Sequence, residues 1–255
     1  MLVKHAWDYR VTAAIPVLEP TDALDAVIAT LRQQTERPYI VLVDTGSRWE
    51  LLEKLCCRHE DEEDIEIHAL RSRGWRHSSA PVGAALDVAL AVCHSEFLYL
   101  THDDVFLKRD DYIADLLAMY ESAPSVAIGY QMSPRDWLTD QWEGMVSHTA
   151  TLCHAPTLRK IGASWSFERS HDQFAVPRGT MGWPDTETAF GLLLKSLNIQ
   201  PTLIGAETNY VRFEDDNLVH CRSYTGSRLY AGARHAEAKA EVAAEVTRVH
   251  ARLIP

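Results

Sequence analysis

The sequence predicts an α/β protein with a mostly parallel central sheet and helices on both of its faces. Short apolar segments, typical of strands that are covered on both faces, recur along the first 130 residues. Between them lie segments whose apolar residues recur at helical spacing. Acidic residues close two of the apolar segments, at the strand ends where open α/β sheets bind ligands. Such alternation is typical of a parallel sheet flanked by helices.

The first two elements show this alternation clearly. An apolar run over residues 11–18 ends at Glu19-Pro20 and predicts a strand. The next segment has one apolar helical face, formed by Leu24, Val27, Ile28 and Leu31. Thr21 or Asp22 is the expected N-cap of this helix. Further elements are expected as a strand at 39–43, a helix at 49–59, a strand at 65–70, a buried helix at 82–93, a strand at 97–100, a helix near 113–120 and a strand at 125–130.

The second half is less regular. Residues 131–182 are rich in Trp, His, Ser and Gly, and we expect binding loops there with one possible strand at 149–153. A helix over 190–197 and a strand near 202–204 follow. The Ala- and Glu-rich segment 235–253 predicts a C-terminal helix that packs either on the domain or on a second subunit, in which case the protein is a homo-oligomer.

Length and composition narrow the class of protein. A chain of 255 residues suits one large α/β domain. A net charge of −11 opposes nonspecific binding to nucleic acid or anionic lipid. The five cysteines show no paired CxxC spacing, which is typical of reduced thiols in a cytoplasm. Because neither a signal-peptide pattern nor a bilayer-length apolar run is present, we expect a cytoplasmic protein without stable membrane insertion.

Carboxylates at four positions are the candidates for chemistry. Asp44 closes the second strand, where it either accepts a hydrogen bond from a nucleobase N–H or only forms the turn before Gly46. Asp103 and Asp104 follow a buried strand, and such paired carboxylates repel unless a cation such as Mg²⁺ or Mn²⁺ lies between them. The alternative for that pair is a helix N-cap with solvated acids. Asp185 precedes an amphipathic helix, and its position by itself favours an N-cap.

Together these segments resemble the family 2 glycosyltransferases of the GT-A fold, which invert the anomeric centre. The resemblance covers roughly residues 11 to 205, and the order of the matches along the chain carries it. In that order the matching segments are Ala14-Ile15-Pro16-Val17 (opening strand), Leu31-Arg32-Gln33-Gln34-Thr35 ("S-L-x-x-Q-T"), Val41-Leu42-Val43-Asp44-Thr45-Gly46-Ser47 ("V-V-D-D-G-S"), the helix from Gly83 to Ala91 ("G-x-A-x-A-x-N"), Tyr99-Leu100-Thr101-His102-Asp103-Asp104 (D-x-D strand), Ile161-Gly162-Ala163 ("I-G-G-F") and Pro184-Asp185-Thr186-Glu187 ("E-D-x-E").

The resemblance implies a GT-A domain over residues 1–255, with a nucleotide-sugar half at about 1–130 and an acceptor half at about 131–220. It implies that Asp44 binds the nucleobase and that Pro16 and Asp103 line the donor site. It further implies that Asp104 binds Mn²⁺ or Mg²⁺, and that Asp185 is the general base that deprotonates the acceptor.

Three positions depart from the family pattern. His102 occupies the first position of D-x-D, so metal binding is expected to rest on Asp104. Thr45 replaces the second acid of the base-binding turn, and Pro184 replaces the acid before Asp185.

Further residues have two readings each. Arg73 is one of three arginines after the third strand, and it either contacts the nucleotide or belongs to a solvated basic loop. His220 is either a third metal ligand from a late loop or an ordinary surface or core histidine. Trp183 adjoins Asp185 and either stacks on a sugar or packs in the core. His148 and His154 are excluded as a zinc pair by their spacing.

The resulting prediction is transfer of a sugar from a nucleotide-sugar donor, with a UDP-sugar favoured over GDP- or dTDP-sugars. The acceptor is open between a small molecule, a glycan, a protein and a modified nucleobase. One alternative is a catalytically inactive GT-A domain that binds a sugar nucleotide or a partner protein. A nucleotidyltransferase is disfavoured because no Gly-rich loop with Lys or Arg follows the first strand.

Overall fold

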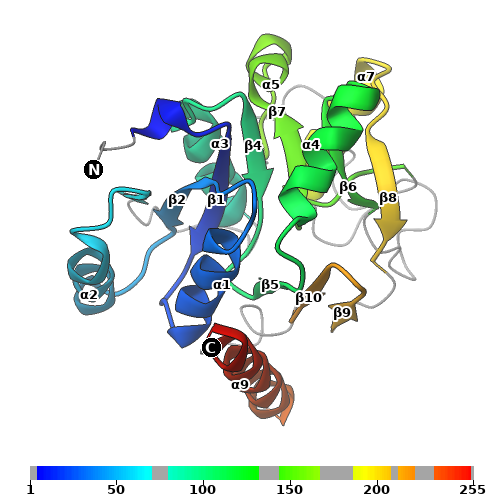
Figure 1. Ribbon diagram of the computed structural model, residues 1–255. Coiled ribbons are helices and arrows are strands. Elements are labelled where there is room, and N and C mark those ends of the chain that lie inside the picture. Colours follow the sequence, from blue (N-terminus) through cyan, green and yellow to red (C-terminus); the bar gives the residue numbers. More distant parts are fainter. Residues whose placement is uncertain are drawn as a thin grey trace.

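The computed structural model of the 255-residue chain describes residues 5–70, 80–131, 144–166, 186–207, 212–221 and 233–253. Seven strands form its central sheet: β1 (Val11–Val17), β2 (Tyr39–Asp44), β3 (Ile65–Ala69), β4 (Phe97–Leu100), β6 (Ala127–Gln131), β7 (Thr151–His154) and β8 (Thr202–Ala206). Their spatial order is β3-β2-β1-β4-β7-β6-β8 (Figure 1). Strand β7 runs antiparallel to its neighbours β4 and β6, and every other neighbouring pair is parallel. The predicted mostly parallel α/β sheet is confirmed.

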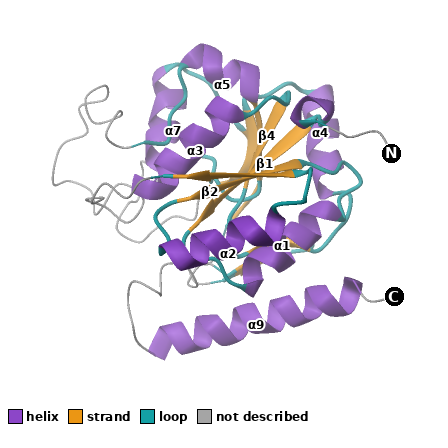
Figure 2. Ribbon diagram, turned by 90° about the vertical axis from the view of Figure 1, so that its left-hand side faces the viewer, coloured by secondary structure: helices purple, strands orange, loops and turns teal. Residues whose placement is uncertain are grey.

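Helices cover both faces of this sheet, as Figure 2 shows. They are α1 (Asp22–Arg32), α2 (Trp49–His59), α3 (Ala80–Val92), α4 (Tyr112–Ser122), α5 (Ala155–Ile161) and α7 (Thr186–Ser196). Helix α9 (Ala233–Leu253) packs on the outer side of α1, and the short 3-10 helix η1 (Ala6–Asp8) precedes β1. Alternate strand side chains enter two separate cores. Ile15 on β1 joins a core with α1, α2, α4 and α9, whereas Ala14 beside it joins a core with α3, α5 and α7.

Helix α1 begins and packs as its sequence predicts. The Thr21 hydroxyl accepts a hydrogen bond from the Ala23 N–H at 3.4 Å, which identifies Thr21 as the N-cap. The four residues of the predicted apolar face are all buried in the first core. At the last turn, the Arg32 guanidinium donates to both carboxylate oxygens of Asp64 and thereby ties α1 to the segment before β3.

The C-terminal helix packs on its own chain. Helix α9 lies along α1, with Ala238, Val242 and Val249 buried (Figures 1 and 2). Glu245 on the same helix is 3% exposed and accepts a hydrogen bond from Arg212 at 2.7 Å. This helix was expected to pack either on the domain or on a second subunit, and in the structure it packs on the domain. Among the described residues, no helix combines the length and apolar character needed to cross a membrane.

A second, three-stranded sheet was not predicted. It consists of β5 (Val105–Leu107), β10 (Leu218–His220) and β9 (Phe213–Glu214), all antiparallel. Strands of two or three residues leave almost no periodic pattern in a sequence, and this pairing joins segments more than 100 residues apart. Its presence corrects one of the two readings of Asp103 and Asp104. The chain continues from them into β5 rather than into a helix, and both are only 2% exposed, so they are not a solvated helix N-cap.

Candidate functional site

Charged and imidazole side chains gather at the carboxyl edge of the central sheet. His102 and Asp104 follow β4, and Glu207 follows β8. Because β4 and β8 run in the same direction, these residues leave the sheet at the same edge. His148 precedes the antiparallel strand β7 and therefore reaches this edge from the other direction. Open α/β sheets bind ligands at such an edge.

The small sheet brings His220 to Asp104. Strand β10 pairs with β5 so that His220 lies opposite Val105, and the Cys221 N–H donates to the Asp104 carbonyl at 3.0 Å. As a result the His220 Nε2 lies 3.5 Å from the Asp104 Oδ1. The side chains of Asp104 and His220 are 3% and 7% exposed. Two predicted metal ligands that are far apart in the sequence are therefore neighbours in a buried site.

Glu207 faces the other nitrogen of the same imidazole. The His220 Nδ1 lies 3.4 Å from the Glu207 Oε1, and Glu207 is fully buried. The sequence analysis missed this residue. A usable signal was present, because Glu207 follows the apolar strand β8 just as Asp44 closes β2 and Asp104 follows β4.

Two further imidazoles complete the cluster. The His102 ring is stacked near that of His220, with an interplanar angle of 14° and centroids 5.6 Å apart. The His148 ring lies beside that of His102, with the two ring centroids 4.4 Å apart. His154 ends β7, at the opposite edge of the sheet, so the exclusion of a zinc pair with His148 agrees with the fold.

Asp44 and Pro16 lie at the same carboxyl edge, on β2 and β1. Asp44 is 1% exposed and its carboxylate accepts hydrogen bonds from the backbone N–H groups of Gly46 and Ser47. The turn-forming interpretation of Asp44 therefore agrees with the structure. A carboxylate has about four acceptor sites, so these three hydrogen bonds leave capacity for one nucleobase N–H. The Thr45 hydroxyl donates to the Val17 carbonyl at 2.9 Å, which joins the ends of the two strands.

Three predicted residues, Arg73, Trp183 and Asp185, lie outside the described residues. Their contacts with the nucleotide, the sugar and the acceptor stay predictions.

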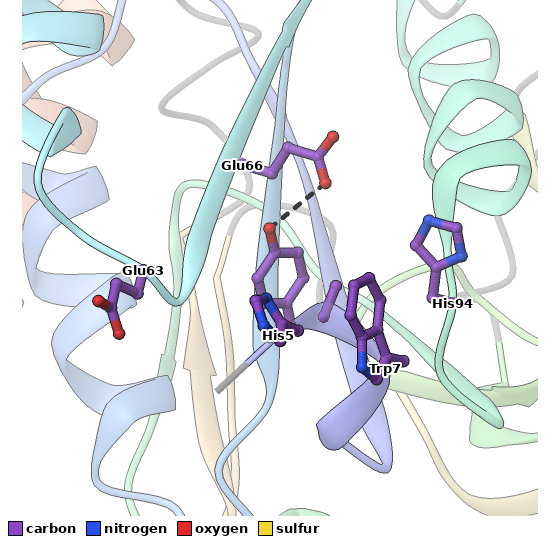
Figure 3. Close-up of a pocket in the computed structure, with 7 residues that line it drawn as sticks. His5, Trp7, Glu63, Glu66 and His94 are labelled. Atoms are coloured by element: carbon purple, nitrogen blue, oxygen red, sulfur yellow. Dashed lines mark hydrogen bonds between the residues drawn. The ribbon is translucent and has the colours of Figure 1, made fainter. Parts of the chain in front are cut away.

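A separate hollow of about 400 Å³ lies at the amino edge of the sheet. Its lining comprises His5, Ala6, Trp7, Tyr39, Glu63, Glu66 and His94 (Figure 3). The Tyr39 hydroxyl donates to Glu66 at 3.4 Å, and burial together with the Glu66 charge raises the pKa of Tyr39 to about 12. None of the predicted site residues lines this hollow, since it begins where the strands start and the acidic cluster lies where they end.

Whether the site can hold a divalent cation depends on the donor atoms that its residues supply. Within the described ranges, no three His, Cys, Asp or Glu side chains are arranged to hold a metal ion. Asp104 and His220 supply two donors, with their facing atoms 3.5 Å apart. Two ligands about 2.1 Å from one ion are separated by about 3 to 3.5 Å when they subtend about 90° to 110°. The pair therefore fits two positions of one ion, and a diphosphate and water are the usual source of the others.

Comparison with known proteins identifies the fold. No protein-family model and no curated protein matches the chain. Among solved structures, the mannosyltransferase PcManGT from Pyrobaculum calidifontis, in complex with GDP-Man and Mn²⁺, is similar over 94% of this chain, with 16% identity and a TM-score of 0.54. The chain spans 64% of the length of that protein.

A second similar protein is TarS from S. aureus. Its 1–349 fragment gives a TM-score of 0.56 at 13% identity, with 94% of this chain and 71% of the fragment covered. The longer TarS structure gives a TM-score of 0.55 at 14% identity, with 94% of this chain and 43% of that chain covered. The chain therefore has a fold of the GT-A glycosyltransferase type. The acidic and imidazole cluster lies at the carboxyl edge of its central sheet.

Proposed function

We propose that this protein is a glycosyltransferase that transfers a sugar from a nucleotide-sugar donor to an acceptor nucleophile. The observation that carries the proposal is the pairing of Asp104 and His220 at the carboxyl edge of a sheet of the GT-A type. One structural neighbour was solved with GDP-Man and Mn²⁺, which supports a nucleotide sugar and a divalent cation as ligands of this fold.

In this proposal each side chain has one task. Asp104 and His220 hold Mn²⁺ or Mg²⁺, with Asp103 beside the donor. Asp44 accepts a hydrogen bond from the nucleobase at the end of β2. When bound, the cation offsets the negative charge that develops on the departing diphosphate, which is often the largest share of catalysis in such reactions.

The acceptor side depends on residues known here only from their sequence. Asp185 removes the proton from the acceptor nucleophile as the anomeric carbon is attacked from the face opposite the diphosphate, so the configuration inverts. Trp183 stacks on the sugar or acceptor, and Arg73 contacts the nucleotide. The acceptor is a small molecule, a glycan, a protein or a modified nucleobase, and a homo-oligomer is compatible with this arrangement.

The direct test is a thermal-shift screen of UDP-, GDP-, dTDP- and CMP-sugars with and without Mn²⁺. A donor at 100 times its Kd stabilises the folded state by about 2.7 kcal/mol. For a chain of this size that corresponds to a rise in Tm of roughly 5 to 10 °C. We expect the rise to need Mn²⁺, to occur with one nucleotide family, and to vanish in Asp104→Ala.

A matched control removes a carboxylate elsewhere. Asp61 lies exposed in the turn after α2, so Asp61→Ala should retain the full ligand-induced shift. No shift with any donor in the wild-type protein contradicts the proposal.

The catalytically inactive GT-A domain is the second candidate. His102 in place of the first D-x-D acid is the observation that favours it. Donor binding without release of free nucleotide, with any acceptor or with water, would establish this candidate. Turnover that is lost in Asp185→Asn while donor binding is retained would establish the enzyme.

A further inference from the structure

Glu207, His220 and Asp104 form a buried row in which one imidazole lies between two carboxylates. The row is assembled from three segments, since Asp104 follows β4, Glu207 follows β8 and His220 ends β10. The three side chains are 3%, 0% and 7% exposed in that order. Carboxylates at such depth are costly unless polar neighbours compensate for lost hydration, so this arrangement calls for a reason.

The two ring nitrogens of His220 have different neighbours. Nδ1 faces Glu207 at 3.4 Å and Nε2 faces Asp104 at 3.5 Å. A neutral imidazole has one N–H donor and one lone pair, so its tautomer decides which carboxylate it serves. A proton on Nδ1 gives Glu207 a donor and leaves the Nε2 lone pair facing Asp104. A proton on Nε2 does the reverse and leaves no lone pair on the side of the predicted cation.

We propose that Glu207 is a positioning residue that accepts the Nδ1–H of His220 and so keeps the Nε2 lone pair directed at the cation beside Asp104. The inference rests on the metal site of the proposed function. Metal-binding histidines almost always donate their other N–H to a carboxylate, a carbonyl or water, which fixes the tautomer and the ring orientation. Glu207 occupies the place that such a partner takes.

The backbone around the row gives Glu207 a fixed position from which to act. The Glu207 N–H donates to the Gln131 carbonyl at 3.1 Å, which ties this residue to the end of β6. His220 is held by the pairing of β10 with β5, and Cys221 after it is bonded to the Asp104 carbonyl. The His102 ring lies near-parallel to that of His220, with the centroids 5.6 Å apart. The backbone pairing therefore places the His220 ring between the two carboxylates, and Glu207 sets which nitrogen carries the proton.

The first measurement reads the tautomer and needs neither metal nor donor. In ¹H–¹⁵N long-range correlation spectra at pH 9, we expect wild-type His220 with its proton on Nδ1. The signal is assigned by its loss in His220→Gln. In Glu207→Ala the Nδ1 proton loses this acceptor, and a larger share of the Nε2–H form is expected. A wild-type ring that is protonated on Nε2 overturns the inference.

The second measurement reads metal affinity by Mn²⁺ titration, with free Mn²⁺ followed by electron paramagnetic resonance in the presence of UDP or GDP. Loss of an outer partner of a metal-binding histidine costs about 10- to 100-fold in affinity, and we expect a loss of this size in Glu207→Ala. Glu207→Gln keeps the shape and one acceptor oxygen, so its loss should be smaller. It also guards against misfolding of the alanine variant.

Glu214→Ala is the matched control, because Glu214 lies exposed on β9 of the same small sheet and pairs with Arg212 and Lys108. Its Mn²⁺ affinity should equal that of the wild type. Unchanged affinity in a folded Glu207→Ala overturns the inference. Absence of Mn²⁺ binding in the wild type with either nucleotide sinks the proposed function instead, and the tautomer spectrum then still decides the role of Glu207.

Discussion

Replacing Gly83 with alanine tests how α3 holds the chain segment around Trp165, which lies within the predicted acceptor half. A Cβ at this position would lie 2.2 Å from the Trp165 carbonyl oxygen and 2.8 Å from its carbon. Both are backbone atoms, so the clash cannot be relieved by rotating a side chain. One helical turn later, Asp87 accepts hydrogen bonds from the Ser164 hydroxyl at 2.7 Å and the Trp165 N–H at 2.8 Å. The close approach and the two bonds hold the same segment.

The magnitude follows from three contributions. Overpacking of a well-packed site costs about 1–3 kcal/mol. A shift of the segment strains or breaks the two bonds to Asp87, at about 0.5–1.5 kcal/mol each. Alanine gains about 1 kcal/mol over glycine in a helix. We therefore expect Gly83→Ala to lower the free energy of unfolding by about 1–5 kcal/mol, which is a fall in Tm of roughly 3 to 15 °C.

Urea and thermal unfolding followed by circular dichroism give both quantities. Ala91→Gly, at an exposed position of the same helix, measures the helix-propensity contribution separately and should cost about 1 kcal/mol. Asp87→Ala tests the hydrogen bonds without the clash. A Gly83→Ala protein at least as stable as the wild type would refute the packing of Trp165 against α3.

Three further predictions concern charge, thiols and metal choice. Burial acts to raise the pKa of Asp64, but hydrogen bonds led by those from Arg32 outweigh it and hold that pKa below its ordinary value. The stabilisation from ionised Asp64 is therefore complete above about pH 4 and is lost as the pH falls. Arg32→Ala should lower the free energy of unfolding at pH 7 by about 1.5–3 kcal/mol. Urea titrations at several pH values should also show that this free energy depends less on acid pH in the variant. Burial raises the pKa of Cys221 to about 12. At pH 8 a disulfide reagent should therefore modify the exposed thiols at positions 56 and 57 in the native protein and reach Cys221 only on unfolding. Early modification of Cys221 would contradict its burial. An imidazole is a better ligand for Mn²⁺ than for Mg²⁺, so Mn²⁺ should bind more tightly in a competition titration. His220→Asp should reduce the difference in affinity between the two cations.

The central sheet was predictable because its middle strands β1, β2 and β4 are covered on both faces. A strand such as β2 is then apolar at nearly every position, and the polar turn after Asp44 marks its end. Helix α2 was predicted with the bounds that it has, Trp49–His59, because an amphipathic pattern and a polar turn define its start. These signals are local, and the first 130 residues contain many of them.

The candidate site was predictable only where its residues follow such strands. Asp104 was found because it follows β4. His220 was predicted to be either a metal ligand or an ordinary histidine, because nothing local indicates that β10 pairs with β5. Glu207 was missed although it follows strand β8 as Asp104 follows β4, because none of the family motifs that the sequence resembles includes this position. The contact between Asp104 and His220 arises from the pairing of β5 with β10, more than 100 residues apart, which no periodicity encodes.

The composition of the cluster bears on whether the proposed donor site is active. His102 removes one carboxylate from the D-x-D segment, which by itself weakens the attraction for a cation. Glu207 adds a buried carboxylate on the far side of His220, so the carboxylates of Asp104 and Glu207 flank this imidazole. Buried carboxylates favour a positive charge close by, and in the proposed function a divalent cation beside Asp104 supplies it. The two carboxylates that flank His220 would therefore provide part of the negative charge that the first D-x-D acid would otherwise supply.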